Sequence, residues 1–300
     1  MRSRIILGLT TTNCGILDGR EVDMIILAGT PVGNDGDASP RLRQALESAD
    51  LIAAEDTRRL LNLAGRLGIT LRAPVVAYHD HNEAAKATDL VAAAQAGKRV
   101  VMVSDAGMPA VSDPGYRLVE RAYDEGVAVT VIPGPSAVLA ALAISGLPSD
   151  RFAFEGFPAR KTGERKASFA KLARDERTLI FFESPRRLAE TLEDMASVFG
   201  QDRRAVVARE LTKTYESVQR GTLAELTQWA RGEVRGEIVI VVEGYREVTT
   251  SIVDADVVAE VLELVKLGLR LKDAAGHVAK RVGLRKNEVY AAAVEGATPD

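Results

Sequence analysis

Between residues 24 and 132, short apolar runs rich in β-branched residues alternate with segments of helical length. Each apolar run has the length of a buried strand, and each intervening segment can form a crossover helix. Strands joined through helices pair in parallel, and the helices cover both faces of the sheet. The sequence therefore predicts an α/β domain with strands over 24–28, 51–54, 75–77, 99–104 and 127–132 and helices over 40–49, 57–67, 82–96 and 115–125.

A second α/β segment follows a cluster of Gly, Pro, Ser and Asp at residues 146–150, where we expect the domain boundary. Its strand pattern is less regular, which favours a mixed sheet. We expect domains over 24–146 and 147–245, and a helical tail over 246–300. Residues 1–23 are expected to form a disordered extension. The second domain is predicted to have strands over 152–154, 178–182, 204–208 and 238–242 and helices over 166–174, 185–199 and 223–230.

The composition narrows the class of protein. The chain has a net charge of −3 and one cysteine, Cys14. A near-neutral chain cannot grip nucleic acid over its whole surface, so any RNA contact must come from local basic patches. One cysteine excludes an intramolecular disulfide and a cysteine-rich zinc site, and it fits a reducing, cytoplasmic compartment. The longest apolar run, 136–148, is shorter than the roughly 20 residues that a membrane span needs.

Three loops that combine Gly and Pro with small polar residues each follow a predicted strand. They cover residues 29–37, 104–115 and 133–136. Ligands of open α/β sheets bind at the carboxyl ends of the strands, so these loops predict a small-molecule site. Two alternatives to ligand binding stay open at this point: Asp105 is also a typical turn or cap residue, and Ser136 is a natural N-cap for the apolar helix after it.

Polar residues cluster at four further places, over 55–59, 78–83, 182–186 and 209–213. The acidic and basic residues of 55–59 also suit an ion-paired helix start. His79 and His81 would point to the same side of an extended segment, but no third ligand accompanies them, so no metal site is predicted.

Nine of these segments together resemble one family. In order along the chain they read TPVGN, LIAAEDTRR, YHDHNE, SDAGMPAVSDPGY, IPGPSAVLAALAISGLP, FAFEGFPARK, FFESPRRL, ARELTKTYE and RGEIVIVVEG. They resemble the ribosomal RNA small subunit methyltransferase I family, part of the tetrapyrrole methylase superfamily, over about residues 24–290. Three positions depart from the family pattern: Gly29 stands where proline is common, Met108 where threonine is frequent, and Arg186 where histidine is frequent.

The resemblance implies a fold, a cofactor and a reaction. It implies two α/β domains with S-adenosylmethionine (SAM) in the cleft between them, a homodimer, and 2′-O-methylation of a cytidine ribose in 16S rRNA of the small ribosomal subunit. The residues that it assigns to SAM binding are Pro31, Gly33, Asp105, Ala106, Gly107, Pro133, Gly134 and Ser136, followed by Glu183, Arg209 and Glu210 from the second domain.

A ribose hydroxyl is a weak nucleophile, so a general base would assist its methylation. We name Glu55, Asp56 and His79 as the catalytic candidates, with Glu183 and Glu210 as further carboxylates in the motifs. The sequence does not rank them.

RNA contacts are expected from basic residues gathered in two segments, 158–177 and 266–286, and in the motifs. Each segment can neutralise phosphates and make binding dependent on salt, although a solvated helix face would look the same. The tail also has the pattern of two amphipathic helices joined by a glycine turn, which resembles a helix-turn-helix. The RNA-binding candidates are Arg58, Arg59, Arg160, Lys161, Arg165, Lys166, Lys213, Lys280, Arg281, Arg285 and Lys286.

Two other functions stay open on the sequence. One is a tetrapyrrole C-methyltransferase acting on precorrin or uroporphyrinogen, which the basic segments disfavour. The other is a non-catalytic RNA-binding assembly factor that has kept the fold, which the intact loops disfavour.

Overall fold

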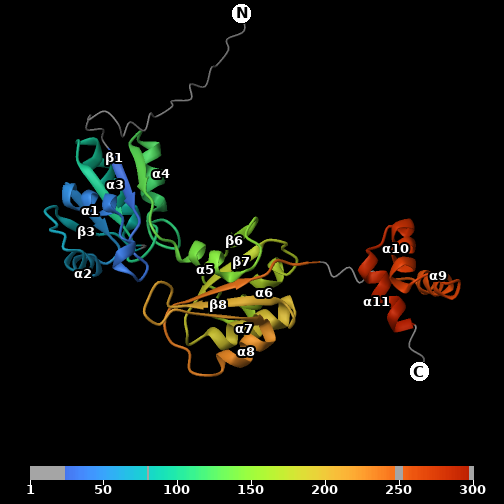
Figure 1. Ribbon diagram of the computed structural model, residues 1–300. Helices are drawn as coiled ribbons and strands as arrows, with labels where there is room; N and C mark the ends of the chain where they lie inside the picture. The colour runs from blue at the N-terminus through green and yellow to red at the C-terminus, as the bar shows by residue number, and fades with distance from the viewer. Residues whose placement is uncertain (1–23, 80, 247–252, 297–300) are drawn as a thin grey trace, which may run out of the picture. The chain divides into compact units, whose positions relative to one another are not determined.

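The computed structural model describes residues 24–79, 81–246 and 253–296, so the extension 1–23 lies outside the described residues. The chain divides into two compact units, Met1–Tyr245 and Arg246–Asp300. The first unit holds two five-stranded sheets, and the second is helical (Figure 1). We call residues 24–136 the first lobe and residues 137–245 the second lobe.

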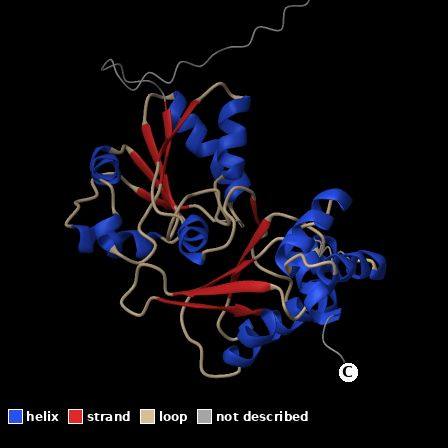
Figure 2. Cartoon of the chain, turned by 45° about the vertical axis from the view of Figure 1, so that its right-hand side comes forward, coloured by secondary structure: helices blue, strands red, loops and turns tan. Residues whose placement is uncertain are grey.

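The sheet of the first lobe is parallel throughout, in the order β3-β2-β4-β1-β5. Period-2 alternation sends Ile26 and Val101 to one face and Ile25 and Val100 to the other. Helices α1 and α2 cover the first of these faces and α3 and α4 the second, on either side of the strands in Figure 2. The predicted parallel α/β fold is confirmed. The elements are β1 Met24–Ala28, α1 Pro40–Ser48, β2 Leu51–Ala54, α2 Thr57–Leu67, β3 Val75–Ala77, α3 Glu83–Gln95, β4 Arg99–Val103, α4 Tyr116–Asp124 and β5 Ala128–Ile132.

Local signals explain where these helices begin. Ser39 caps α1 by accepting a hydrogen bond from the backbone N–H of Leu42 at 3.1 Å, and Pro40 occupies the first helical position. Asp56 caps α2 in the same way, and it accepts from the N–H of Arg58 at 2.8 Å. Because these caps are local in sequence, the predicted helix bounds agree with the structure to within a residue.

The second lobe contains the mixed sheet expected from its irregular pattern, in the order β6-β7-β10-β8-β9. Only β6 and β7 pair in parallel, and the other pairs are antiparallel. Strand β9 was not predicted, because it is a polar edge strand with little buried surface. The elements are α5 Ala137–Ser145, β6 Phe152–Phe154, α6 Thr162–Leu172, β7 Thr178–Glu183, α7 Leu188–Phe199, β8 Arg204–Arg209, β9 Ser217–Thr222, α8 Leu223–Ala230 and β10 Ile238–Val242.

Helix α5 belongs by packing to the second lobe. Its buried Val138, Ala141 and Leu142 join a core with Ile180 and Val241 of the second sheet. The chain therefore crosses between lobes at residues 133–136, directly after β5, although the expected boundary falls after α5. Consequently the third motif loop is also the hinge between the two sheets, and it brings the ends of both sheets together.

The second unit is a three-helix cluster with its own small core. Helices α9 (Ala255–Lys266), α10 (Leu271–Val282) and α11 (Lys286–Gly296) pack around Val261, Val278 and Val289. Gly283 ends α10 in the left-handed conformation, with φ of 74°, as a glycine turn between helices requires. Within the parts of the chain that are described, no helix has the length and apolar character to cross a membrane.

Candidate active site

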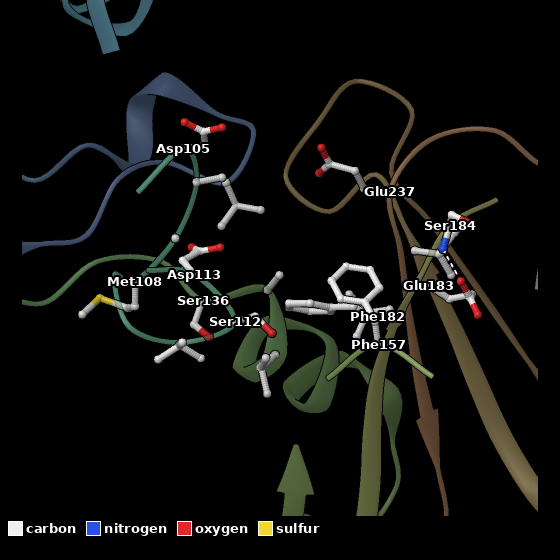
Figure 3. Close-up of a pocket in the computed structure, with 18 of the residues that line it drawn as sticks. Asp105, Met108, Ser112, Asp113, Ser136, Phe157, Phe182, Glu183, Ser184 and Glu237 are labelled. Carbon is white, nitrogen blue, oxygen red and sulfur yellow. Dashed lines mark hydrogen bonds between the residues drawn. The ribbon is translucent and has the colours of Figure 1, made fainter. Parts of the chain in front are cut away.

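A cavity of about 460 Å³ lies where the carboxyl ends of the first-lobe strands face the second lobe (Figure 3). Side chains from the first lobe stand on one side of it, and Phe157, Phe182 and Glu183 stand on the other. Its walls are Val32, Glu55, Arg59, the loop 105–108, residues 111–113, Ser136, Ala137, Val138, Phe157, residues 182–185 and residues 236–239. We call this the main cavity.

Backbone hydrogen bonds hold the three motif loops against one another. Thr30 and Gly107 form an isolated bridge, with N–H to carbonyl distances of 2.8 and 3.1 Å in the two directions. Gly134 donates its backbone N–H to Met108 Sδ at 3.3 Å. The loops after β1, β4 and β5 therefore form one connected surface at the edge of the sheet, as their positions in the sequence predict.

Glu55, Asp105 and Arg59 are connected by hydrogen bonds and an ion pair in the wall of the main cavity. Glu55 Oε2 accepts from the N–H of Asp105 at 3.1 Å, and Asp105 Oδ1 accepts from the N–H of Asp56 at 3.0 Å. The guanidinium of Arg59 lies 3.2 Å from Asp105 Oδ2. Burial raises the pKa of Asp105 above its ordinary value, and Arg59 offsets part of this shift. Asp105 thus places a partly desolvated carboxylate at the cavity.

Asp56 and His79, the other two candidates for a base, do not line the main cavity. The cap hydrogen bonds from Arg58 and Arg59 lower the pKa of Asp56, which suits a helix start. His79 lies two residues after the end of β3, and its backbone N–H donates to Asn82 Oδ1 at 2.9 Å. Asp80, between the two histidines, lies outside the described residues. Of the three catalytic candidates, only Glu55 borders the cavity.

The YHDHNE motif supports the long loop 104–115 from behind. The buried Glu83 accepts hydrogen bonds from the backbone N–H groups of Gly115 at 2.9 Å and Arg117 at 3.1 Å, and from the hydroxyl of Tyr78 at 3.3 Å. It therefore caps α4, which has no side-chain cap of its own. This contact fixes the end of a loop in which Ala110 and Ser112 hold the strained positive φ angles of 66° and 63°.

Of the residues expected to bind SAM, five line the main cavity: Asp105, Ala106, Gly107, Ser136 and Glu183. Pro133 and Gly134, with Ser136, line an open hollow beside it. Pro31 and Gly33 flank Val32, which does line the main cavity. Ser136 caps α5 by accepting from the N–H of Leu139 at 3.5 Å, and it also lines the main cavity.

The two second-lobe carboxylates, Glu183 and Glu210, already accept hydrogen bonds from groups of the protein. Glu183 is fully buried, and it accepts from the N–H of Ser184 at 2.7 Å and from Thr191 Oγ1 at 2.5 Å. Glu210 Oε1 accepts from the N–H of Glu237 at 2.8 Å and from Lys213 at 3.0 Å. Glu210 therefore lies outside the main cavity and positions the loop that carries Gly236 and Glu237 into its wall.

Arg209 points away from the main cavity. Its guanidinium donates to Ser217 Oγ at 3.0 Å and to the carbonyls of Arg235 and Tyr215 at 3.2 and 3.0 Å. It lines a separate hollow with Trp229. In this structure Arg209 holds the β8–β9 turn together.

Two of the RNA-binding candidates are corrected by the structure. Arg165 is 1% exposed and pairs with Asp194 at 2.5 Å, so it has no surface to offer to a phosphate. Lys213 lies 3.0 Å from both Glu210 and Glu237, so its charge is already neutralised. Sequence reasoning missed these pairs because Asp194 and Glu237 are distant in sequence from Arg165 and Lys213, and because Glu210, three residues before Lys213, was assigned to SAM binding.

The other first-unit candidates keep accessible charge. Arg58, Arg160 and Lys161 are exposed, and Lys166 is half-buried. Lys161 pairs with Glu164, and Lys166 pairs with Asp194. Arg59 is exposed at the rim of the main cavity. In the second unit Lys280, Arg285 and Lys286 are exposed, and Arg281 pairs with Glu260.

Several cavity residues carry no sequence signal of their own. Ser112 and Asp113 lie within a recognised loop, but Phe157, Phe182 and Glu237 come from the second lobe. The motifs FAFEGFPARK, FFESPRRL and RGEIVIVVEG contain them, so the motifs mark the right segments without singling out these side chains.

Comparison with known proteins identifies the family. A family model described as Tetrapyrrole (Corrin/Porphyrin) Methylases matches residues 24–227. The ribosomal RNA small subunit methyltransferase I of Mycobacterium tuberculosis is 49% identical over 275 residues, which cover 90% of this chain and 94% of that protein. The chain belongs to the ribosomal RNA small subunit methyltransferase I family. The member of this family from Escherichia coli O157:H7 is 42% identical over 275 residues, with the same coverage of both chains.

A family model also matches the second unit, and solved structures outside this family share the fold of the first unit. A model described as RsmI C-terminal HTH domain matches residues 252–297. Among solved structures, the methyltransferase CobJ has a TM-score of 0.57 at 22% identity, covering 75% of this chain and 96% of its own. Uroporphyrin-III-C-methyltransferase from Thermus thermophilus has a TM-score of 0.52 at 19% identity, covering 73% and 94%. These two structures share the tetrapyrrole methylase fold of the first unit.

Proposed function

We propose that this protein uses SAM to methylate the ribose 2′-hydroxyl of a cytidine in 16S rRNA of the small ribosomal subunit. The observation that carries the proposal is the main cavity. Loops that are far apart in the sequence, and that include the family motifs, converge on it from both lobes. Its volume of about 460 Å³ lies in the range of roughly 300–1,000 Å³ typical of small-molecule sites. The relatives at 40–49% identity carry the name of a small-subunit rRNA methyltransferase.

The residues of the main cavity suit the chemical parts of SAM. Asp105 supplies a carboxylate for the ribose hydroxyls or the ammonium of the cofactor. Val32, Val138 and Phe182 supply an apolar wall for the adenine ring. Glycine at 107, with φ of 80°, leaves the loop backbone open to a ligand that lies close to it. The sulfonium of bound SAM supplies an activated methyl group.

The protein's main task is then to position the RNA. Holding a 2′-oxygen in line with the methyl group can lower the barrier by roughly 7–11 kcal/mol in favourable cases. A general base adds roughly 10²–10⁴-fold. We propose Glu55 for this role in preference to Asp56 and His79, because it alone borders the cavity. Asp105 is the candidate ligand for the cofactor.

The substrate is held by exposed basic residues at the rim of the main cavity and beyond it. Arg58, Arg59 and Arg160 are exposed on the first unit, and the second unit adds Lys280, Arg285 and Lys286. We propose that the helix-turn-helix-like tail docks the ribosomal subunit. We also propose that the protein is a homodimer, as the resemblance to the family implies. We propose a cytoplasmic location, which the single cysteine supports.

The reaction can be tested directly with trideuteromethyl SAM and small subunits purified from a strain that lacks this protein. Nucleoside mass spectrometry of the 16S rRNA should reveal deuterated 2′-O-methylcytidine. Uroporphyrinogen III, offered in parallel, should remain unlabelled. Label on the tetrapyrrole would overturn the proposal in favour of a C-methyltransferase. Binding of subunits without any binding of SAM would favour an assembly factor.

A further inference from the structure

A second cavity of about 610 Å³ lies beside the main cavity. Phe157, Glu183 and Ser184 line both, so the two cavities share a wall. The remainder of the second cavity is formed by residues 158–160 and Arg187. Phe157 therefore lies at the boundary between the two cavities.

Phe157 is an exposed aromatic residue at this shared wall. The residue is 61% exposed, whereas Phe169 and Phe181 of the same lobe are buried. Its ring meets Phe182 edge-on, with 5.5 Å between centroids and 61° between planes, and Phe182 meets Phe154 in the same way at 4.8 Å. The three rings form a row that ends in the exposed Phe157, which Figure 3 shows beside Phe182.

Two arginines donate hydrogen bonds to backbone carbonyls of the loop that carries Phe157. Arg187 Nη2 donates to the carbonyls of Pro158 at 2.8 Å and Ala159 at 2.9 Å. Arg165 Nη1 donates to the carbonyls of Ala159 and Arg160, both at 3.3 Å. Arg165 is in turn fixed by Asp194, and Arg187 lies 3.4 Å from Glu183. The loop that presents Phe157 is therefore preorganised.

Two exposed arginines belong to the segments that form these cavities. Arg160 follows Phe157 in the same loop, and Arg186 follows the cavity residues Ser184 and Pro185. Both are exposed, and neither forms an ion pair with the described part of the chain. Phe157 and Arg160 line the same cavity. An exposed aromatic ring near positive charge suits single-stranded RNA, because the base stacks and the phosphates meet positive charge.

We propose that Phe157 is a stacking platform for an unpaired nucleobase of the RNA substrate, that the second cavity receives this base, and that Arg160 and Arg186 contact its flanking phosphates. The proposal rests on the proposed function, because the bound ribose must then lie between the second cavity and the methyl group in the main cavity. It assigns Phe157 to substrate binding and not to the cofactor alone.

The test compares F157A, F157L and F157W, with Y123A as the control. Tyr123 is 71% exposed on α4 and lines neither cavity. Removing one stacked base contact should weaken binding by roughly 5- to 150-fold. We expect F157A to raise the KM for unmethylated small subunits by such a factor, while calorimetry gives a Kd for SAM within about two-fold of wild type. F157L should resemble F157A, F157W should restore binding, and Y123A should match wild type.

Two results would overturn the proposal. An unchanged KM for subunits in F157A would remove Phe157 from substrate binding. A Kd for SAM that rises as much as the KM for subunits would make Phe157 a wall of the cofactor site only. Failure of the proposed function is distinguishable from both, because the wild-type protein itself would then leave 16S rRNA unlabelled.

A spectroscopic readout addresses stacking itself. The chain has one tryptophan, Trp229, so the F157W/W229F double variant carries its only tryptophan at the platform. Stacked bases quench indole fluorescence, so we expect unmethylated subunits to quench this variant and not Y123W/W229F. Equal behaviour of the two variants would contradict a stacked base at residue 157.

Discussion

Gly29 and Gly134 lie so close together that neither position has room for a side chain. A Cβ built on Gly29 would lie 2.7 Å from Gly134 Cα, and one built on Gly134 would lie 2.8 Å from the carbonyl carbon of Gly29. Both obstructions are backbone atoms, which cannot swing aside. This contact joins the first and third motif loops at the point where the chain crosses between the lobes.

We therefore predict that Gly134→Ala separates these loops, weakens SAM binding by at least ten-fold and lowers the melting temperature. Gly65→Ala in α2 is the matched control, because a Cβ there meets nothing within 4 Å. Alanine is the better helix former, so the control should be neutral or stabilising by up to about 1 kcal/mol. Calorimetry with SAM and thermal unfolding measure both effects. Normal SAM affinity in Gly134→Ala would show that the contact does not shape the site.

Asp105→Ala should weaken SAM binding while the fold survives. A hydrogen bond to a charged group contributes about 1.5–3 kcal/mol, which corresponds to roughly 10- to 150-fold in Kd. Burial raises the pKa of Asp105, and its carboxylate lines the main cavity, where a bound ligand can contact it. Asp89, an exposed residue of α3, provides the control. Calorimetry should give a raised Kd for SAM in Asp105→Ala and an unchanged Kd in Asp89→Ala. Equal Kd values would remove Asp105 from the cofactor site.

Replacing Arg165 by alanine should reduce stability, whereas replacing Arg160 by alanine should reduce RNA binding. Arg165→Ala leaves the buried Asp194 without its closest partner, which costs about 3–5 kcal/mol of stability. Arg160→Ala should leave stability within about 0.5 kcal/mol, weaken RNA binding and reduce the salt slope by about one. Trp229 in α8 reports unfolding of the second lobe by urea. A stable Arg165→Ala variant with weakened RNA binding would restore Arg165 as an RNA contact.

The lowered pKa of Glu210, which positions a loop in the wall of the main cavity, predicts that the stability of the protein depends on pH. The backbone N–H of Glu237 and the ammonium of Lys213 lower the pKa of Glu210 below its ordinary value of 4.5. A lowered folded pKa adds stability that is present above the unfolded pKa and is lost as the pH falls through the folded value. Wild type should therefore exceed Glu210→Gln in urea resistance at pH 7, and the difference should shrink below about pH 4.5. A pH-independent difference would exclude this linkage.

Removal of the second unit should separate catalysis from docking. A chain ending at Tyr245 keeps both sheets and every residue of the main cavity, because the units divide there. It should bind SAM as the full chain does and lose affinity for the small subunit. Filter binding over a range of salt concentrations measures the loss. Equal subunit affinity for both chains would show that the tail does not dock the substrate.

Local patterns predicted most of the fold. Ser39 with Pro40, and Asp56, mark helix starts within a few residues, and the uninterrupted apolar runs of β1 and β2 mark buried strands. Strand β9 escaped prediction because an edge strand buries little and therefore needs few apolar residues. The packing of α5 on the second sheet was also missed, because an apolar helix fits either lobe equally well.

The site was predicted as loops more accurately than as side chains. The strand-end position of Asp105 follows from its sequence, and it does line the main cavity. The capping of α4 by Glu83 and the pairing of Arg165 with Asp194 join residues about thirty positions apart, so no local pattern contains them. The same holds for Phe157, whose exposure depends on how three rings pack across two strand ends.

The most direct test is mass spectrometry of 16S rRNA from a strain that lacks this protein, complemented with wild type or with Asp105→Ala. The account predicts that one 2′-O-methylated cytidine disappears from the mutant strain, returns with the wild-type protein and does not return with Asp105→Ala. An rRNA methylation pattern that is identical in all these strains would contradict it.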